Sequence, residues 1–212
     1  MKTPINKLNF KGKTLYRKTV TENILNIYND NRFGFSNSWY LDANMFSRDL
    51  GKEFNINHLK VVGIIAALSP LKSWDENKRI AKSFLQSGKS YHTTVMTNKA
   101  IAIRDHKGTE CSCKEQEAPN LSEFIINTLR GNKIQSFYIN IAFPYDDYAV
   151  TIDRHAIAIC LGRNTINNEQ SITDNQYDFF VSCYADVAKS LGLAPNLVQS
   201  ITWEKWREIK KL

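Results

Sequence analysis

A carboxylate and an imidazole stand two residues apart in the segment 151–155, as Asp153 and His155. An apolar run from 157 to 161 follows and ends at Gly162, so the pattern predicts a helix whose first turn contains Asp153. Free backbone N–H groups and the positive end of the helix dipole favour a carboxylate there. At the edge of a base-sized cavity, such a carboxylate could stabilise an oxocarbenium-like sugar as a glycosidic bond breaks, or activate water.

Each of these side chains also has a purely structural interpretation. Aspartate is common at helix starts because it caps free N–H groups, so Asp153 could be a cap alone. His155 could hold a phosphate, a substrate or the carboxylate of Asp153, or it could bond to the backbone. Arg154 is expected at the surface, where it could reach a DNA phosphate.

The composition permits a polyanionic partner without requiring one. The 212 residues include 28 Lys and Arg against 21 Asp and Glu, a formal net charge of +7. Phosphate contacts need such residues, but a basic protein that binds no nucleic acid has the same composition. The hydrophobic content of 42% predicts a packed core. No stretch approaches the roughly 18 apolar residues of a membrane span and no signal peptide is recognisable, so we expect a cytoplasmic protein with no membrane partner.

The four cysteines do not suggest a disulfide framework. Cys111 and Cys113 are closer together than zinc ligands usually are, and although His106 could complete part of a site, two exposed thiols are the preferred interpretation. Cys160 and Cys183 stand in apolar helical contexts and are predicted to lie in the core. We therefore expect no metal and no cofactor, and whether Cys111 and Cys113 bind a metal stays open.

Helical patterns account for most of the chain, which predicts an all-α fold of about nine to ten helices. Ser73 and Glu76 form a capping box at the start of one helix, and Asn120 is expected to cap another. The polar stretch 106–119 is predicted as a loop, and 149–152 is the one candidate strand. The expected helices are 19–29, 38–50, 59–68, 74–88, 98–104, 121–129, 133–143, 153–161, 171–191 and 194–209.

Three further motifs precede Asp153 along the chain. The first is Ala66-Ala67-Leu68-Ser69-Pro70 followed by Trp74, Asn77 and Ala81. The second is Leu129-Arg130-Gly131-Asn132-Lys133, and the third is Asn140-Ile141-Ala142-Phe143. In this order, and with Ile152-Asp153-Arg154-His155 after them, the motifs resemble the helix-hairpin-helix DNA glycosylase superfamily. The resemblance extends over residues 59–162.

The resemblance implies a glycosylase-like helical fold for residues 1–212, as a single unit or as two lobes with the cleft between them. It implies an enzyme that flips a base of DNA into a pocket and cleaves its N-glycosidic bond with Asp153. His155 and Lys133 are further candidate catalytic residues. The residues expected to contact DNA or the flipped base are Gly131, Asn132, Arg154, Trp74, Asn77, Asn140 and Tyr138.

The hairpin departs from the superfamily pattern. The superfamily has a Leu-Pro-Gly-x-Gly hairpin, whereas here Gly131 stands alone and the loop is shorter. If the loop is aligned without a gap, Gln135 instead of Lys133 takes the position of the hairpin lysine, which is nucleophilic in the lyase branch. The four-cysteine iron–sulfur pattern of the superfamily is also absent. These departures weaken two expectations: that backbone amides of the hairpin bind phosphate, and that Lys133 has a lyase role.

Two other functions remain open from the sequence. Residues 131–155 also resemble phage-encoded relatives of the superfamily, the α-glutamyl/putrescinyl thymine pyrophosphorylases, which attach an amine to an activated thymine-type base and keep the glycosidic bond. Asp153 or His155 would then accept the proton of the incoming amine. The altered hairpin also permits a non-catalytic DNA-binding or inhibitory module. The target base, a single- or double-stranded substrate, a free nucleoside substrate and the oligomeric state are likewise open.

Overall fold

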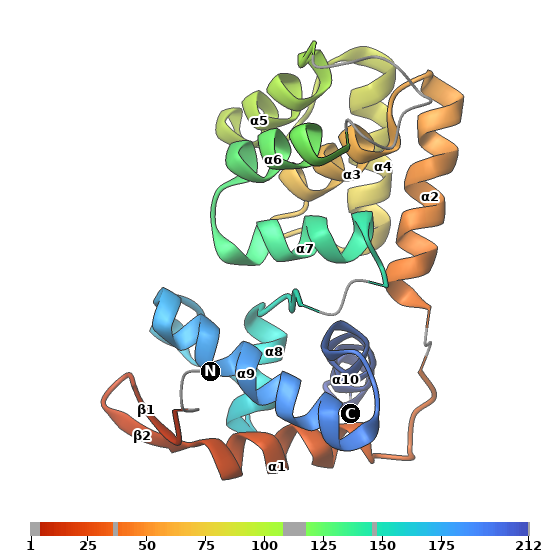
Figure 1. The fold of residues 1–212 in the computed structure, drawn as a ribbon. Coiled ribbons are helices and arrows are strands. Elements are labelled where there is room, and N and C mark those ends of the chain that lie inside the picture. Colours follow the sequence, from red (N-terminus) through yellow and green to blue (C-terminus); the bar gives the residue numbers. More distant parts are fainter. Residues whose placement is uncertain (1–4, 36–37, 108–117, 146–147, 212) are drawn as a thin grey trace. The chain divides into compact units, whose positions relative to one another are not determined.

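The structure is a computed structural model that describes residues 5–35, 38–107, 118–145 and 148–211 (Figure 1). These residues form ten α-helices, one 3₁₀-helix and one two-stranded sheet, so the predicted all-α class is confirmed. The chain divides into two compact units, a terminal unit of Met1–Trp39 with Tyr145–Leu212 and a central unit of Tyr40–Pro144. The range of the resemblance, 59–162, therefore crosses from the central unit into the terminal unit.

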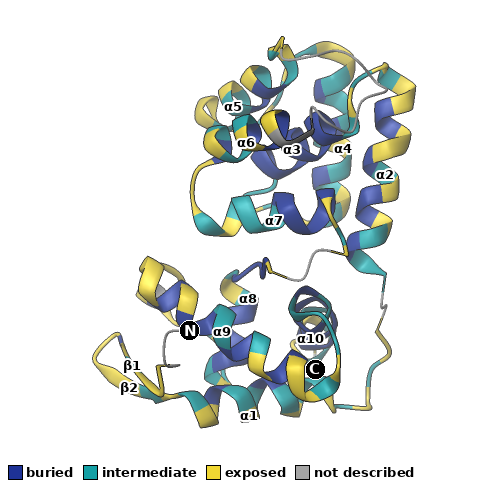
Figure 2. Cartoon of the chain, in the orientation of Figure 1, coloured by how far each residue is buried: buried dark blue, intermediate teal, exposed yellow. Residues whose placement is uncertain are grey.

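The central unit contains α2 to α7. Their bounds are α2 (Trp39–Phe54), α3 (His58–Ala67), α4 (Trp74–Ser87), α5 (Thr94–Asp105), α6 (Ala118–Leu129) and α7 (Asn132–Ala142). Helix α3 is the centre of this unit, because it packs against α4, α5, α6 and α7 and is buried from Leu59 to its end (Figure 2). At Gly63 an added Cβ would lie 2.8 Å from Ile125 Cγ2 and 3.1 Å from Ile103 Cγ2. Glycine at this position therefore lets α5 and α6 approach α3 closely.

Acid is expected to destabilise the protein through His58, the first residue of α3. Burial lowers the pKa of His58 to about 4, and the nearby Arg48 lowers it as well. An unfolded histidine has a pKa of about 6.5, so the unfolded chain takes up this proton first as the pH falls. The contribution of His58 is complete above about pH 6.5 and is lost toward pH 4. The difference between the two pKa values corresponds to about 3.4 kcal/mol, and because His58 is only half-buried and screened by solvent we expect about 2 kcal/mol.

Urea unfolding of the full chain at pH 7 and pH 4.5 measures this effect. Carboxylates also titrate in this interval, so the informative quantity is the difference between the wild type and His58→Gln, which has no titrating group at this position. We expect the free energy of unfolding of the variant to fall less between the two pH values. Equal losses in both proteins would show that His58 does not carry the proton linkage.

The terminal unit contains the remaining elements. Their bounds are β1 (Lys7–Phe10), β2 (Lys13–Tyr16), α1 (Arg17–Tyr28), α8 (Arg154–Leu161), the 3₁₀-helix η2 (Asn167–Gln170), α9 (Asp174–Leu191) and α10 (Pro195–Ile209). Helices α1, α8, α9 and α10 pack on one another, and their core includes Phe10, Ile24 and Phe180. Cys160 and Cys183 are free and fully buried in this core, as predicted.

Strands are where the sequence-based expectation was wrong. Strands β1 and β2 form an antiparallel hairpin in which Lys7 pairs with Tyr16 and Phe10 with Lys13. Its turn residues Lys11 and Gly12 both have positive φ, which is the two-residue turn that suits the twist of a hairpin. The segment 149–152, expected as a strand, pairs with no strand in the described part of the chain. Its backbone bonds instead to a side chain, because the hydroxyl of Tyr177 donates to Val150 O and accepts from Ile152 N.

Both ends of α4 agree with the prediction. Ser73 Oγ accepts from Glu76 N at 3.2 Å, and Gly88 ends α4 with a left-handed backbone. The predicted cap at Asn120 is wrong, because α6 already begins at Ala118 and Asn120 lies inside its first turn. Similarly, α5 begins four residues before the expected Asn98, with Thr93 as its N-cap. Most of the predicted loop 106–119, with Cys111 and Cys113, lies outside the described residues.

Candidate active site

Asp153 is the N-cap of α8, one position before the first turn in which it was predicted. Its Oδ1 accepts from the backbone N–H groups of His155 and Ala156, at 2.9 and 2.8 Å. The helix begins here because the preceding extended segment is buried and bonded to Tyr177, and it ends at Gly162, whose φ is +66°. Asp153 therefore satisfies two of the four N–H groups that a helix start leaves free.

The other carboxylate oxygen of Asp153 is held from a second helix. Trp203 of α10 donates its indole Nε1–H to Asp153 Oδ2 at 3.1 Å. The indole ring of Trp203 also meets the ring of His155 edge to face, with centroids 6.1 Å apart. Three N–H donors from two elements thus fix the carboxylate of Asp153, which is half-buried. The terminal unit brings Asp153, His155 and Trp203 together.

His155 is a half-buried imidazole beside this carboxylate. Burial lowers the pKa of His155; the charge of Asp153 opposes this, whereas Arg154, Lys210 and Arg207 lower the pKa further. Its Nδ1 is buried and has no hydrogen-bond partner among the residues the structure describes. The imidazole is therefore neutral at neutral pH and can accept a proton.

The proposed hairpin residues lie in the central unit, between α6 and α7. Only Arg130 and Gly131 separate the two helices, and both have positive φ, +51° and +93°. The carbonyl of Gly131 accepts from the N–H groups of Ile134 and Gln135, each at 3.1 Å, which starts α7. Arg130, Gly131 and Lys133 are exposed, and Asn132 is half-buried. The connection is therefore a tight, basic turn between two helices.

Two polar side chains brace this turn from behind. Gln135 donates its Nε2–H to the carbonyl of Ile126 at 2.9 Å, and Lys99 of α5 donates to the carbonyl of Leu129. Lys99 thereby satisfies a carbonyl group that the end of a helix leaves free, whereas Ile126 O accepts from both Gln135 and the backbone N–H of Arg130. Gln135 is consequently occupied in the structure of the turn, whereas Lys133 is exposed.

The residues expected to contact a flipped base are mostly part of the core of the central unit. Tyr138 and Asn140 of α7 are fully buried, and the hydroxyl groups of Tyr138 and Ser122 lie 3.0 Å apart. Asn77 is 2% exposed, and its Oδ1 has no hydrogen-bond partner among the described residues. Trp74 is half-buried and packs edge to face on Phe46, with centroids 5.9 Å apart.

Leu71 is a surface feature that sequence reasoning missed. It is 92% exposed and has a φ of +62°, in a turn in which Lys72 N donates to Ser69 O at 3.1 Å. The preceding Pro70 and the positive φ identify a type II turn, whose third position normally favours glycine. The carbonyl of Pro70 also accepts from His92 Nε2 at 3.1 Å. The sequence signal was Ser69-Pro70 before a helix cap, but only the backbone shows that an apolar side chain projects from the turn.

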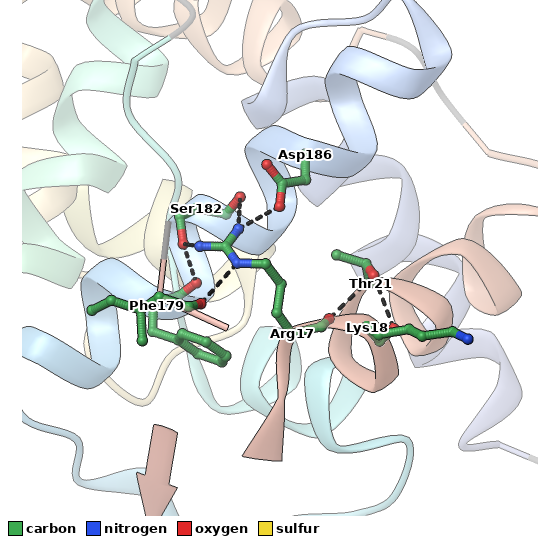
Figure 3. A network of polar contacts seen from close by, with 7 residues as sticks. Arg17, Lys18, Thr21, Phe179, Ser182 and Asp186 are labelled. Carbon is green, nitrogen blue, oxygen red and sulfur yellow. Dashed lines mark hydrogen bonds and ion pairs between the residues drawn. The ribbon is translucent and has the colours of Figure 1, made fainter. Parts of the chain in front are cut away.

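A groove of the terminal unit lies away from Asp153. It has a volume of about 580 Å³ and is lined by Asn6, Tyr16, Arg17, Lys18, Thr21, Leu25, Asp186, Val187 and Ser190. Figure 3 shows that the guanidinium of Arg17 points toward α9. It donates to Ser182 Oγ at 2.7 Å and to Asp186, and its Nε–H bonds to Ile5 O. Arg17 thus joins the segment before β1 to α9 from the first turn of α1.

The described residues contain no group of three His, Cys, Asp or Glu side chains that could hold a metal ion. Cys111 and Cys113 lie outside this search. Among the helices of the described residues, none combines the length and the apolar character that crossing a membrane requires.

The comparison that decides the family is the match to a family model over residues 7–210. The chain belongs to DUF7178, a family of unknown function. Comparisons with curated proteins and with solved structures give no match. The matched range of DUF7178 begins at β1 and ends after α10, so the family pattern contains both units and every described helix and strand.

Proposed function

We propose that this protein acts on a base of DNA and cleaves its N-glycosidic bond with Asp153 as the catalytic carboxylate. The observation that carries the proposal is the fixed position of this side chain at the start of α8. Oδ1 is held by two backbone N–H groups and Oδ2 by the indole of Trp203. A catalytic group must be held in its reactive geometry, and two helices hold this one.

The carboxylate of Asp153 retains capacity for a substrate. An ionised carboxylate has about four lone-pair sites, and the described residues use three of them. The remaining site, on Oδ2, can face the positive charge that develops on the sugar as the glycosidic bond lengthens, or can bind the attacking water. His155, neutral and next to Asp153, is the second candidate for accepting a proton.

Two features of the central unit support a nucleic-acid substrate. Arg130 and Lys133 are exposed at the turn between α6 and α7, where they can contact phosphates. Leu71 projects from a turn into solvent, and apolar side chains of this kind are inserted between base pairs when a protein unstacks DNA.

Amine transfer to an activated 5-hydroxymethyluracil-type base is a second candidate, and His155 is the observation that favours it. An amine becomes nucleophilic only after losing a proton, and a neutral imidazole with a lowered pKa can take that proton. In this reaction the amine nitrogen forms a bond to the methylene carbon of the base, and the activating group leaves with the bonding electron pair. The glycosidic bond survives, so the two candidates differ in their products.

A panel of duplex and single-stranded oligonucleotides that carry thymine or modified thymine-type bases tests the proposal. After incubation with the full chain, an aldehyde-reactive probe is used to detect abasic sites. We expect abasic sites in at least one oligonucleotide together with release of the free base. A gain in mass on an intact nucleoside would support amine transfer instead. Oligonucleotides that are bound but chemically unchanged throughout the panel would indicate a non-catalytic DNA-binding module.

A further inference from the structure

The arginines of the terminal unit fall into two groups. Arg17, Arg32 and Arg163 each form an ion pair with a carboxylate. Arg154 and Arg207 are exposed and form no ion pair with any residue the structure describes. These two arginines without a carboxylate partner are near His155, and the positive charge of each lowers the pKa of His155.

Lys210 is the third basic residue near His155. We call Arg154, Arg207 and Lys210 the basic patch. Arg207 is in the last turn of α10 and Lys210 is its C-cap, three residues later, so the two side chains leave the same side of the helix end. Arg154 is the first residue of α8, directly after Asp153. Trp203 links the two helices at this point, because its indole N–H bonds to Asp153, the residue before Arg154, and its ring lies under Arg207.

Aromatic side chains hold part of the basic patch in position. The guanidinium of Arg207 stacks over the ring of Trp203 at 4.6 Å from its centroid, and the ammonium of Lys210 lies 5.9 Å from the ring centre of Trp206. Trp203 is itself bonded to Asp153. A guanidinium held over an aromatic ring by a cation–π contact keeps N–H groups with which it can bind an anion.

The oxygens of the Asp153 carboxylate are bonded to N–H groups, and Glu208 of α10 pairs with Lys211. Three cations close together repel one another, and an anion bound between them would relieve this repulsion. Phosphate fits best, because it carries enough oxygens to accept from two guanidinium groups and an ammonium at once.

We propose that the basic patch binds a phosphate group of a nucleotide, either within a DNA strand or on a free nucleotide. The choice of a nucleotide rests on the proposed function, whereas the choice of phosphate rests on the three cations. Arg154 directly follows Asp153 in the sequence, so a phosphate bound by Arg154 would lie near the carboxylate. The basic patch would therefore position the nucleotide whose base or sugar meets the carboxylate.

The test measures binding of a fluorescein-labelled single-stranded oligonucleotide by anisotropy at several salt concentrations. The variants are Arg154→Gln, Arg207→Gln and the double variant. The matched control is Lys189→Gln, which removes one exposed charge from a different helix of the same unit, α9. We expect each patch variant to weaken binding several-fold and to reduce the slope of log K against log salt by about 0.7, as for one lost phosphate contact. The control should change neither.

A second arm identifies the source of the phosphate. Thymidine 5′-monophosphate and thymidine are compared as competitors, because they differ only in the phosphate. If the monophosphate competes and thymidine does not, and if the double variant no longer shows this competition, the site binds a free nucleotide. Binding of the oligonucleotide without such competition would assign it to the DNA strand. The proposal is overturned if the double variant binds both probes as the wild type does, or if Lys189→Gln weakens binding equally.

These outcomes are independent of whether the protein cleaves a glycosidic bond. If the wild type leaves DNA unchanged but the double variant loses salt-dependent binding, the proposed function fails and the phosphate site stands. If the double variant binds normally and Asp153→Asn loses base release, the phosphate site fails and the proposed function stands.

Discussion

Replacement of Asp153 by asparagine is expected to reduce base release by about 100-fold or more, because the variant loses the negative charge that acts on the sugar or on water. The fold should survive this change. Asparagine caps helices about as well as aspartate, so the free energy of unfolding should fall by no more than about 1 kcal/mol. The rate of base release and the urea midpoint, measured on the same preparation, separate chemistry from folding.

Trp203→Phe is the companion variant, because it keeps the carboxylate and removes the indole N–H that bonds to Asp153 Oδ2. If Trp203 positions the carboxylate, the rate should fall less than in Asp153→Asn, and the loss should appear in kcat more than in KM. If Asp153→Asn releases the base as fast as the wild type, Asp153 is a helix cap alone and the catalytic group lies elsewhere.

The second large effect is expected at Gly63, in the centre of α3. A valine there would place methyl groups against Ile103 and Ile125, both fully buried, where even a Cβ lies only 2.8 Å from Ile125 Cγ2. Inserting extra methyl groups into a dense core lowers the free energy of unfolding by about 1–3 kcal/mol. We expect Gly63→Val near the upper end of this range, because valine is branched at Cβ and two helices, α5 and α6, face residue 63. Urea unfolding should show a loss of about 3 kcal/mol.

A double variant locates this strain. Ile125→Leu removes the Cγ2 methyl that faces Gly63, while conserving the volume of the side chain. In a double-mutant cycle, Gly63→Val combined with Ile125→Leu should be more stable than the sum of the single changes predicts. Additive losses would mean that the contact between α3 and α6 does not limit the size of residue 63.

Several helix ends could be predicted because a local interaction sets them. The Ser73 cap, the glycines that end α4 and α8, and Pro195 in the first turn of α10 all depend on residues within one turn of each other. The buried run of α3 was equally clear from its apolar residues. The all-α class follows from these local signals, because the chain contains few alternating patterns.

The sheet could not be predicted in the same way. Strands β1 and β2 have four residues each, and of these eight side chains only Phe10 is buried, so alternation was too weak to detect. The segment 149–152 is apolar and extended, as a strand would be, but it pairs with no strand among the described residues. Its backbone bonds instead to the side chain of Tyr177, which is 25 residues after Ile152 in the sequence. Partners this distant leave no periodic pattern in the sequence.

The candidate site shows the same division. The cap formed by Asp153 is local, whereas its bond to Trp203 joins residues 50 positions apart and was not expected. Nothing in the sequence around Trp203 and Arg207 indicates that they lie beside Asp153. In the central unit, the aromatic and amide residues Tyr138 and Asn140 have the composition of a base pocket but face the core. Residue type could not distinguish these two environments, because both require partners for polar groups.

The central claim is that this protein changes DNA chemically at a base, with Asp153 as the group responsible. Mass spectrometry of DNA after incubation with the wild type and with Asp153→Asn, including released bases and nuclease-digested nucleosides, tests it most directly. We expect one nucleoside to be depleted by the wild type, with its base recovered free in equal amount, and neither change with the variant. An unchanged nucleoside composition for the wild type, at concentrations where the protein binds DNA, would contradict the account.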